Sequence, residues 1–350
     1  MTDRLAESAF LRACRGAATP YTPVWLNRQA GRYMKEYHQV KGNTPSLDFF
    51  KTPELAARVT CDAQRILGVD AAIMFADLLP VLEPMGLQLD YLPGLGPKFA
   101  NPIRSGEAVD ALQVVAAREG TPYIAETVRL IRRELPGDIP LIGFAGAPFT
   151  LASYAIEGQS SKDYLHVKRL MYGDPGAWRA LLEKLVVQVA DYVNLQIDAG
   201  VQAVQIFDSW IGCLSLEDFR EYVQPPTAQL MAAITGRVPI IYFGTGNAHL
   251  VAAMYETGPD LMALDWRTPL VPTWDALGSA AVQGNLDPIV LCADAATVER
   301  QARRLLDSVA GRPGHIFNLG HGIVPSTPVD NVRRLVDVVH GHRRDDAPGG

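Results

Sequence analysis

Two arginines near the amino terminus have a spacing that suits the binding of an anionic ligand. Arg28 and Arg32 bound the segment Arg-Gln-Ala-Gly-Arg, which directly follows the apolar residues 24–26 (Val-Trp-Leu). The apolar run is typical of a short buried strand, and Gly31 lets the backbone turn so that both guanidinium groups can reach one space. Guanidinium groups bind carboxylates and phosphates through paired hydrogen bonds. The pattern therefore indicates a ligand with several such groups, although arginines in a loop can also lie in solvent or pair with neighbouring acids.

Asp77 is the acidic residue best placed for chemistry, because it follows the strand-like residues 71–75 within an apolar frame. Such an aspartate can cap a turn or pair with an arginine. A carboxylate in a site that holds little water can also accept N–H bonds and stabilise a cation that develops during a reaction. Pairing with Arg28 or Arg32 would keep Asp77 ionised.

Three further side chains can donate hydrogen bonds to a ligand. Tyr154 can fill core space or direct its hydroxyl toward a carboxylate, and Ser209 can cap the turn before Trp210 or donate to a ligand. His321 lies between two glycines that permit a close approach of the backbone to a ligand, and its imidazole can donate to a carboxylate.

Apolar strand-like runs alternate with helical patterns along the whole chain. The predicted strands are residues 24–26, 71–75, 141–144, 201–207, 238–243, 260–264, 281–284 and 315–318. Eight such units without a break in composition predict a single α/β domain, a (β/α)8 TIM barrel over residues 1–340, followed by a disordered polar tail over residues 341–350.

The main alternative architecture is a doubly wound sheet. We favour the barrel because the strand count reaches eight and because polar residues recur past one end of the strands, where a barrel has its mouth. Those residues are Arg28, Arg32, Asp77, Asp208, Ser209, Asp265, Asn285 and His321.

The helical patterns have clear start and stop signals in several places. Predicted helices include residues 53–67, with Thr52 as the N-cap, and residues 122–134, 215–235 and 294–310. Residues 92–97 are rich in proline and glycine and are assigned no helix or strand.

The composition excludes several classes of protein. The chain has 350 residues, of which 48% are hydrophobic, and a net charge of −6, which disfavours nucleic-acid binding. Residues 1–18 do not resemble a signal peptide, and no run is long enough to span a membrane, so we expect a cytoplasmic protein. The cysteines are far apart and suit reduced thiols rather than a metal site: Cys14, Cys61, Cys213 and Cys292. Neither the dinucleotide motif G-x-G-x-x-G after a strand nor the hydrolase motif G-x-S-x-G is present.

Several motifs together resemble the uroporphyrinogen decarboxylase family. Residues 23–32 (Pro-Val-Trp-Leu-Asn-Arg-Gln-Ala-Gly-Arg) resemble its amino-terminal signature, and residues 143–158 resemble its second signature. Residues 75–77, 207–210 and 318–322 match in the same order and at compatible spacing, so the resemblance covers the chain from about Phe10 to Val339. One departure is Asn27, where the family usually has methionine.

The resemblance implies a homodimeric (β/α)8 barrel that uses no cofactor and no metal. It implies that the four acetate side chains of uroporphyrinogen III become methyl groups, giving coproporphyrinogen III and carbon dioxide. Asp77, directed toward the pyrrole N–H groups, would stabilise the cation formed when a ring carbon is protonated. Arg28, or a water that an arginine holds, could supply the proton, and the choice between them stays open. The expected substrate-binding residues are Arg28, Gln29, Ala30, Gly31, Arg32, Asp77, Tyr154, Ser209 and His321.

Two other functions fit part of the pattern. A corrinoid-linked methyltransferase would use the same barrel but would hold zinc with His and Cys, and residues 243–247 (Phe-Gly-Thr-Gly-Asn) lack the expected cysteine. A tetrapyrrole-binding protein without turnover would not need Asp77 together with both arginines. We therefore expect an enzyme that acts on a small molecule.

Overall fold

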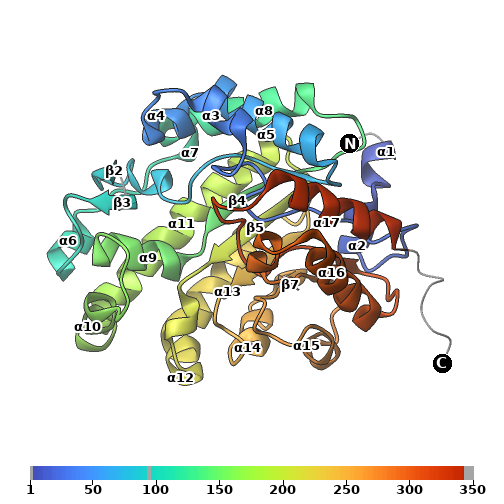
Figure 1. The fold of residues 1–350 in the computed structure, drawn as a ribbon. Helices are drawn as coiled ribbons and strands as arrows, with labels where there is room; N and C mark the ends of the chain where they lie inside the picture. Colours follow the sequence, from blue (N-terminus) through green and yellow to red (C-terminus); the bar gives the residue numbers. More distant parts are fainter. Residues whose placement is uncertain (1–2, 93–95, 343–350) are drawn as a thin grey trace.

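The computed structural model describes residues 3–92 and 96–342. Its centre is a seven-stranded parallel sheet with the strand order β1-β4-β5-β6-β7-β8-β9 (Figure 1). The strands are β1 (Ala72–Ile73), β4 (Leu141–Gly146), β5 (Ala203–Asp208), β6 (Ile240–Gly244), β7 (Leu261–Ala263), β8 (Val282–Gln283) and β9 (His315–Ile316).

The sheet curls, and residues 23–25 bridge its two edges. On the β9 side, Phe317 N donates to Pro23 O at 2.8 Å, and Trp25 N donates to Phe317 O at 3.3 Å. On the β1 side, Asp70 N donates to Val24 O at 2.8 Å. The first predicted strand is thus a short bridging segment rather than a regular strand, and the predicted barrel architecture is confirmed over the doubly wound sheet.

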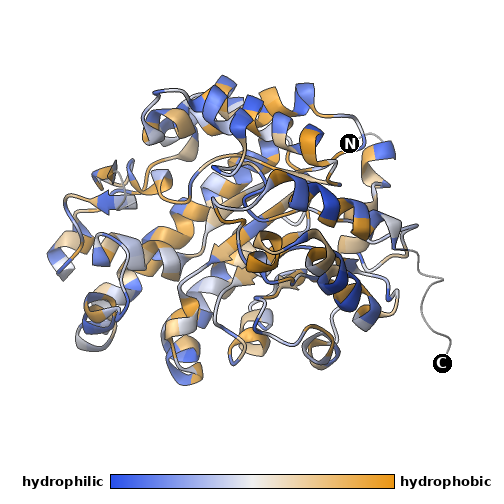
Figure 2. Ribbon diagram, viewed as in Figure 1, coloured by the Kyte–Doolittle hydropathy of each residue, from blue (hydrophilic) through white to orange (hydrophobic). Residues whose placement is uncertain are grey.

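Helices surround the sheet and cover its outer side (Figure 1). Figure 2 shows that the central strands are largely hydrophobic, whereas the hydrophilic residues gather on helices at the surface, including α16. The α-helices are α1 (Asp3–Ala6), α2 (Ala9–Cys14), α3 (Lys35–Lys41), α4 (Ser46–Lys51), α5 (Pro53–Leu67), α6 (Gly106–Asp110), α7 (Ala117–Gly120), α8 (Pro122–Glu134), α9 (Pro148–Glu157), α10 (Leu165–Gly173), α11 (Pro175–Ala199), α12 (Leu216–Asp218), α13 (Gln224–Ala233), α14 (Val251–Tyr255), α15 (Leu270–Leu277), α16 (Ala295–Val309) and α17 (Val329–Gly341). Short 3-10 turns η1 (Pro80–Leu82), η2 (Ile211–Cys213) and η4 (Pro288–Cys292) and the π-helical turn η3 (Phe219–Val223) complete the set.

Helix α5 shows how local sequence sets the helix bounds. Pro53 occupies the first turn, and Gly68 ends the helix in the left-handed conformation, with φ of 68°. Thr52 is the N-cap residue as predicted, but its side chain makes no capping hydrogen bond, because its hydroxyl donates backward to Asp48 O at 2.7 Å.

A β-hairpin that the sequence did not predict lies beyond β1. Strand β2 (Leu89–Leu92) pairs antiparallel with β3 (Gly96–Phe99), and the two strands overlap the two ends of the proline- and glycine-rich residues 92–97. The residues between these two strands lie outside the described part of the chain. The hairpin brings Tyr91 toward the site described below.

The boundary of the predicted tail is corrected by two residues. Helix α17 continues to Gly341, and the ring of His342 is bonded to Asp307 at 2.9 Å, so both residues belong to the fold. The remainder of the predicted tail, residues 343–350, lies outside the described residues. None of the helices in residues 3–92 and 96–342 is both long enough and apolar enough to cross a membrane.

Candidate active site

Asp77 lies past the carboxyl end of β1, in the loop that leads to the turn η1. Its carboxylate accepts a hydrogen bond from Leu79 N at 3.1 Å. Burial raises the pKa of Asp77 above its ordinary value, and three groups oppose that rise: the Tyr91 hydroxyl, the backbone amides of Leu78 and Leu79, and the charge of Arg28. Asp77, Tyr91 and Arg28 therefore act on one another in a single space.

Arg28 is held over the loop that carries His321. Its backbone is left-handed, with φ of 61°, which is uncommon for a residue other than glycine. The aliphatic part of its side chain lies against Gly322 and leaves no room there for a Cβ atom. The glycine on the carboxyl side of His321 is thus explained by the close approach of Arg28.

His321 is neutral near pH 7. Burial and then the charge of Arg28 lower the pKa of His321 to about 4, although Asp265 acts in the opposite direction. Its Nδ1 accepts from Gly322 N at 2.6 Å, which places the ring proton of the neutral form on Nε2. The imidazole is therefore a hydrogen-bond donor that carries no charge of its own.

Tyr154 and Ser209 come from two neighbouring strand ends. Tyr154 lies on α9, which follows β4, and its ring lies over Trp210 with a centroid distance of 3.9 Å. Burial and the charge of Asp77 raise the pKa of Tyr154 to about 12, so its hydroxyl keeps its proton as a donor. Ser209 precedes Trp210 directly after β5, and its carbonyl accepts a hydrogen bond from the Thr245 hydroxyl.

Asp208 holds the Ser209–Trp210 turn in place through buried hydrogen bonds. It is fully buried and accepts hydrogen bonds from the Thr150 hydroxyl at 2.6 Å and the Tyr242 hydroxyl at 2.8 Å. Thr150 in turn accepts from Trp210 N at 3.3 Å. Burial raises the pKa of Asp208 to about 6, while its two hydroxyl donors oppose the rise. This strand-end aspartate therefore positions the turn, and it does so without being exposed in the mouth.

The residues between Arg28 and Arg32 differ in their surroundings. The Gln29 side chain is fully buried; it accepts from Leu26 N at 3.1 Å and donates to Ala71 O at 3.1 Å. Ala30 is also buried, whereas Arg32 is exposed and its charge acts on Tyr37 of α3. The interaction with Asp77 that was predicted for either arginine is thus found for Arg28, while Gln29 anchors the loop.

A chain of buried amide groups crosses the barrel interior beneath Arg28. The Trp25 indole donates to Gln283 at 2.8 Å, Gln283 donates to Gln205 at 2.9 Å, and Gln205 donates to Asn27 at 3.1 Å. Asn27 then donates to Leu319 O at 3.3 Å. Gln205 and Gln283 were not predicted as site residues, although a glutamine inside an otherwise apolar strand is a sequence signal for such a role.

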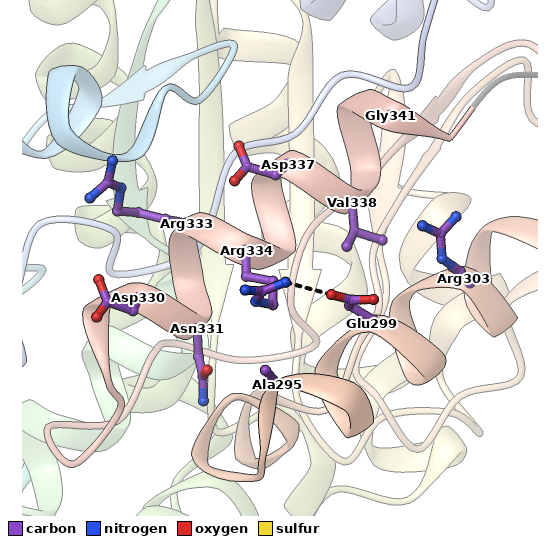
Figure 3. Close-up of a pocket in the computed structure, with 10 residues that line it drawn as sticks. All are labelled: Ala295, Glu299, Arg303, Asp330, Asn331, Arg333, Arg334, Asp337, Val338 and Gly341. Carbon is purple, nitrogen blue, oxygen red and sulfur yellow. Dashed lines mark hydrogen bonds and ion pairs between the residues drawn. The ribbon is translucent and has the colours of Figure 1, made fainter.

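A groove on the outer side of the barrel, between α16 and α17, is separate from this site (Figure 3). Arg334 and Glu299 form an ion pair of 2.6 Å across it. The charged residues that line it are Glu299, Arg303, Asp330, Arg333, Arg334 and Asp337. Because both signs of charge are mixed and no predicted site residue lines the groove, it is not the candidate active site.

Within the described residues, no group of three or more His, Cys, Asp or Glu side chains is arranged to hold a metal ion. The zinc site that the corrinoid-linked alternative would need is therefore not found in residues 3–92 and 96–342.

Comparison with known proteins gives one consistent result. Residues 5–342 match the family model described as uroporphyrinogen decarboxylase (URO-D). The chain is 51% identical over 334 residues to a uroporphyrinogen decarboxylase of Sorangium cellulosum (strain So ce56), covering 95% of both chains. It is 50% identical over 343 residues to the uroporphyrinogen decarboxylase of Roseiflexus sp. (strain RS-1), covering 96% of this chain and 99% of the relative.

Solved structures share the fold at low sequence identity. A methyltransferase from Methanosarcina mazei superimposes with a TM-score of 0.80 at 18% identity, covering 96% of this chain and 98% of that one. A putative vitamin-B12-independent methionine synthase from Listeria monocytogenes has a TM-score of 0.57 at 12% identity and covers 93% and 96%.

Proposed function

Because the chain belongs to the uroporphyrinogen decarboxylase family, we propose that the cluster around Asp77 is the active site of this carboxy-lyase. The enzyme removes carboxyl groups from uroporphyrinogen in porphyrin and haem biosynthesis. Its substrate, uroporphyrinogen III, is a macrocycle of four pyrroles with eight peripheral carboxylates, and its product is coproporphyrinogen III. One observation carries the assignment of the site: a carboxylate, a guanidinium, a tyrosine hydroxyl and a neutral imidazole act on one another at the barrel mouth.

The substrate is held at its edge by donors of hydrogen bonds. Arg28 and Arg32 bind peripheral carboxylates, and guanidinium groups suit this task because they can donate two parallel bonds. The Tyr154 hydroxyl and the protonated ring nitrogen of His321 are further donors, and Ser209 supplies another hydroxyl. The backbone of Gln29, Ala30 and Gly31 shapes the loop over the macrocycle.

Asp77 acts at the centre of the macrocycle, where its carboxylate accepts hydrogen bonds from pyrrole N–H groups. Protonation of a pyrrole ring carbon creates a cation that Asp77 stabilises. The electrons of the bond to the departing carboxyl group then move into the ring, which releases carbon dioxide and leaves an exocyclic methylene. A proton added to that methylene makes the methyl group, and loss of the ring proton restores the pyrrole. Arg28, or a water bound to it, is the candidate donor, because the charge of Arg28 acts on Asp77.

Anaerobic incubation with uroporphyrinogen III, followed by chromatography of the oxidised products, tests the function directly. We expect porphyrins with seven, six and five carboxyl groups to appear in turn and the four-carboxyl product to accumulate. Unchanged substrate would contradict the function. The observed intermediates would also give the order of the four decarboxylations.

The Asp77→Asn variant tests the role of the carboxylate. We expect kcat to fall by about a hundredfold or more, because the neutral amide stabilises the cation far less well. The matched control is Asp110→Asn, since Asp110 is an exposed acid at the carboxyl end of α6. Turnover at the unmodified rate in Asp77→Asn, with Tm retained, would remove Asp77 from the mechanism.

We further propose that the predicted single domain, extended to residue 342, acts as one catalytic domain within a cytoplasmic homodimer. Exposed apolar side chains, including Leu165 and Tyr172 of α10 and Val187 of α11, favour burial against a second copy. Sedimentation equilibrium should give twice the chain mass of 38.1 kDa. A species of single-chain mass at micromolar concentration would contradict the dimer.

A further inference from the structure

The turn that follows β7 is a rigid platform at the barrel mouth. The Asp265 side chain is fully buried and accepts hydrogen bonds from Gly246 N at 2.8 Å and Arg267 N at 2.7 Å. The Asn285 amide donates to Asp265 O at 2.9 Å and to Thr268 O at 2.7 Å. The turn is thereby attached to the ends of β6 and β8 as well as to β7.

Arg267 projects from this platform with its guanidinium already oriented. Its Nη1 is paired with Asp265 Oδ2 at 2.6 Å, and its Cζ lies 3.7 Å from the centre of the Trp266 ring. The Arg267 side chain is nevertheless 55% exposed. Since a guanidinium has five N–H groups, the ion pair with a buried acid leaves donors free to face the mouth.

Trp266 connects Arg267 to the His321 loop. The rings of Trp266 and His321 have a centroid distance of 6.1 Å, and the Trp266 backbone lies so close to Gly320 that no Cβ would fit there. The charge of Arg267 also contributes to the lowered pKa of His321. Arg28 lies against Gly322 of the same loop. The charges of two arginines, Arg28 and Arg267, therefore both act on His321.

We infer that Arg267 is a further substrate-binding residue, which holds a peripheral carboxylate of the macrocycle beyond the carboxylates bound by Arg28 and His321. The buried position of Asp265 supports this inference, because an incoming carboxylate meets the guanidinium and not the acid that orients it. The ligand is an alkyl carboxylate on the outer edge of the substrate, so the inference rests on the proposed function.

The test compares Arg267→Met, Arg267→Lys and a matched control. Methionine keeps an apolar stem against Trp266 and removes the donors, whereas lysine keeps the charge without the planar fork. The control is Arg237→Ala, because Arg237 is also an exposed arginine paired with an acid, Asp198 at 2.7 Å, but precedes β6 at the opposite end of the barrel.

For Arg267→Met, the expected result is a rise of about tenfold in KM for uroporphyrinogen III with kcat within twofold of the unmodified enzyme. The Lys variant should recover part of this loss, and Arg237→Ala should leave KM unchanged. The increase of KM with salt should also be shallower in Arg267→Met, since one charged contact is missing.

An unchanged KM in Arg267→Met, while the unmodified enzyme turns over, would overturn the inference. A purely structural role would instead lower Tm and kcat and leave KM as it was, which would overturn it as well. Failure of the unmodified enzyme to decarboxylate uroporphyrinogen III would refute the proposed function rather than the role of Arg267.

Discussion

Burial of the Asp77 carboxylate is energetically unfavourable, and the hydrogen-bond donors around it offset part of that cost. Burial raises the pKa of Asp77, and the Tyr91 hydroxyl, the Leu79 amide and Arg28 only partly offset that rise. A bound substrate would add pyrrole N–H donors, which favour the ionised form. The free enzyme therefore has too few hydrogen-bond donors around the Asp77 carboxylate. The bound substrate supplies further donors at the place where the cation develops.

This shortage of hydrogen-bond donors in the free enzyme predicts that the pH profile of kcat/KM differs from that of kcat. Activity requires ionised Asp77, so it falls as pH drops through the raised pKa of that group. The profile of kcat/KM reports the free enzyme and that of kcat reports the complex, so the acid limb of kcat/KM should lie at higher pH than that of kcat. Steady-state rates measured from pH 4.5 to 8 check this. Coincident limbs would show that the substrate does not stabilise the ionised carboxylate.

His321 gives a second prediction at the same scale. Its pKa of about 4 means that the free enzyme gains no charge at His321 near pH 6.5. In His321→Asn we expect KM to rise by about tenfold, because one donor to a substrate carboxylate is lost, and the shape of the kcat/KM profile above pH 5.5 to stay the same.

The difference in stability between the unmodified protein and His321→Asn should change with pH in a defined direction. Unfolded His321 takes up a proton near pH 6.5 but the folded residue does so only near pH 4, so the folded state loses stability relative to His321→Asn as pH falls through this window. Tm values at pH 5 and pH 7.5 measure the effect. A gap between the two proteins that does not change with pH would contradict the neutral, buried histidine.

At the scale of elements, buried polar side chains connect strands that carry the site. Asn27 receives a bond from Gln205 of β5 and gives one to Leu319, two residues before His321. It is also the residue directly before Arg28. The amide chain therefore fixes the loop of Arg28 relative to the loop of His321.

Substitution of Asn27 tests this connection. Asn27→Met leaves the buried Gln205 amide and the Leu319 carbonyl without these partners, which should lower stability by about 1–3 kcal/mol and raise KM. In a double-mutant cycle with Gln205→Met, the two losses should be less than additive by about 1 kcal/mol, because the second change removes the orphaned donor. Denaturation midpoints and KM values measure both. Strict additivity would show that the two amides stabilise the fold independently.

The sequence predicted those elements whose pattern is local. Strands β4, β5 and β6 were found because each is a continuous buried run, and the convergence of Arg28, Asp77 and His321 followed from the geometry of strand ends. The predicted continuous helix over residues 215–235 is instead interrupted by the π-helical turn Phe219–Val223. Two prolines follow this turn, and a proline has no N–H to continue the helical bonds.

Other features of the fold and the site could not be predicted from the local sequence pattern. The hairpin that carries Tyr91 lies in a stretch whose prolines and glycines gave no strand signal, and the partners of Asn27 are distant in sequence. Arg267 was not identified, because its role depends on the stacking with Trp266 and the pairing with Asp265, which only the folded turn brings about.

At the scale of the whole molecule, the two ends of the chain close the barrel together. Helix α17 lies beside α5, although they come from opposite ends of the sequence (Figure 1). Asp70, just before β1, accepts hydrogen bonds from the Tyr21 hydroxyl at 2.8 Å and from Val24 N at 2.7 Å. The ring of His340 in α17 is bonded to the same carboxylate at 2.8 Å. Asp70 thus joins residues 23–25, the start of β1 and helix α17.

The ion pair between Asp70 and His340 should weaken as His340 loses its proton. Burial alone would lower the pKa of His340, but the hydrogen bond and charge of Asp70, with a further contribution from Asp337, raise it above its ordinary value. The stabilisation from this pair is therefore complete below the unfolded-state pKa of about 6.5 and is lost as pH rises through the folded-state pKa. Because a third of the His340 side chain is exposed (33%), we expect only about 1 kcal/mol.

A double-mutant cycle of His340→Gln and Asp70→Asn, measured by chemical denaturation at pH 6 and pH 9, isolates the pair from the other bonds of Asp70. Asp70→Asn alone should cost more than His340→Gln, because it also weakens the bonds to Tyr21 and Val24. The coupling energy should be present at pH 6 and small at pH 9. A coupling energy equal at both pH values would mean that a neutral hydrogen bond, and not the charge on His340, holds the last helix to the start of the barrel.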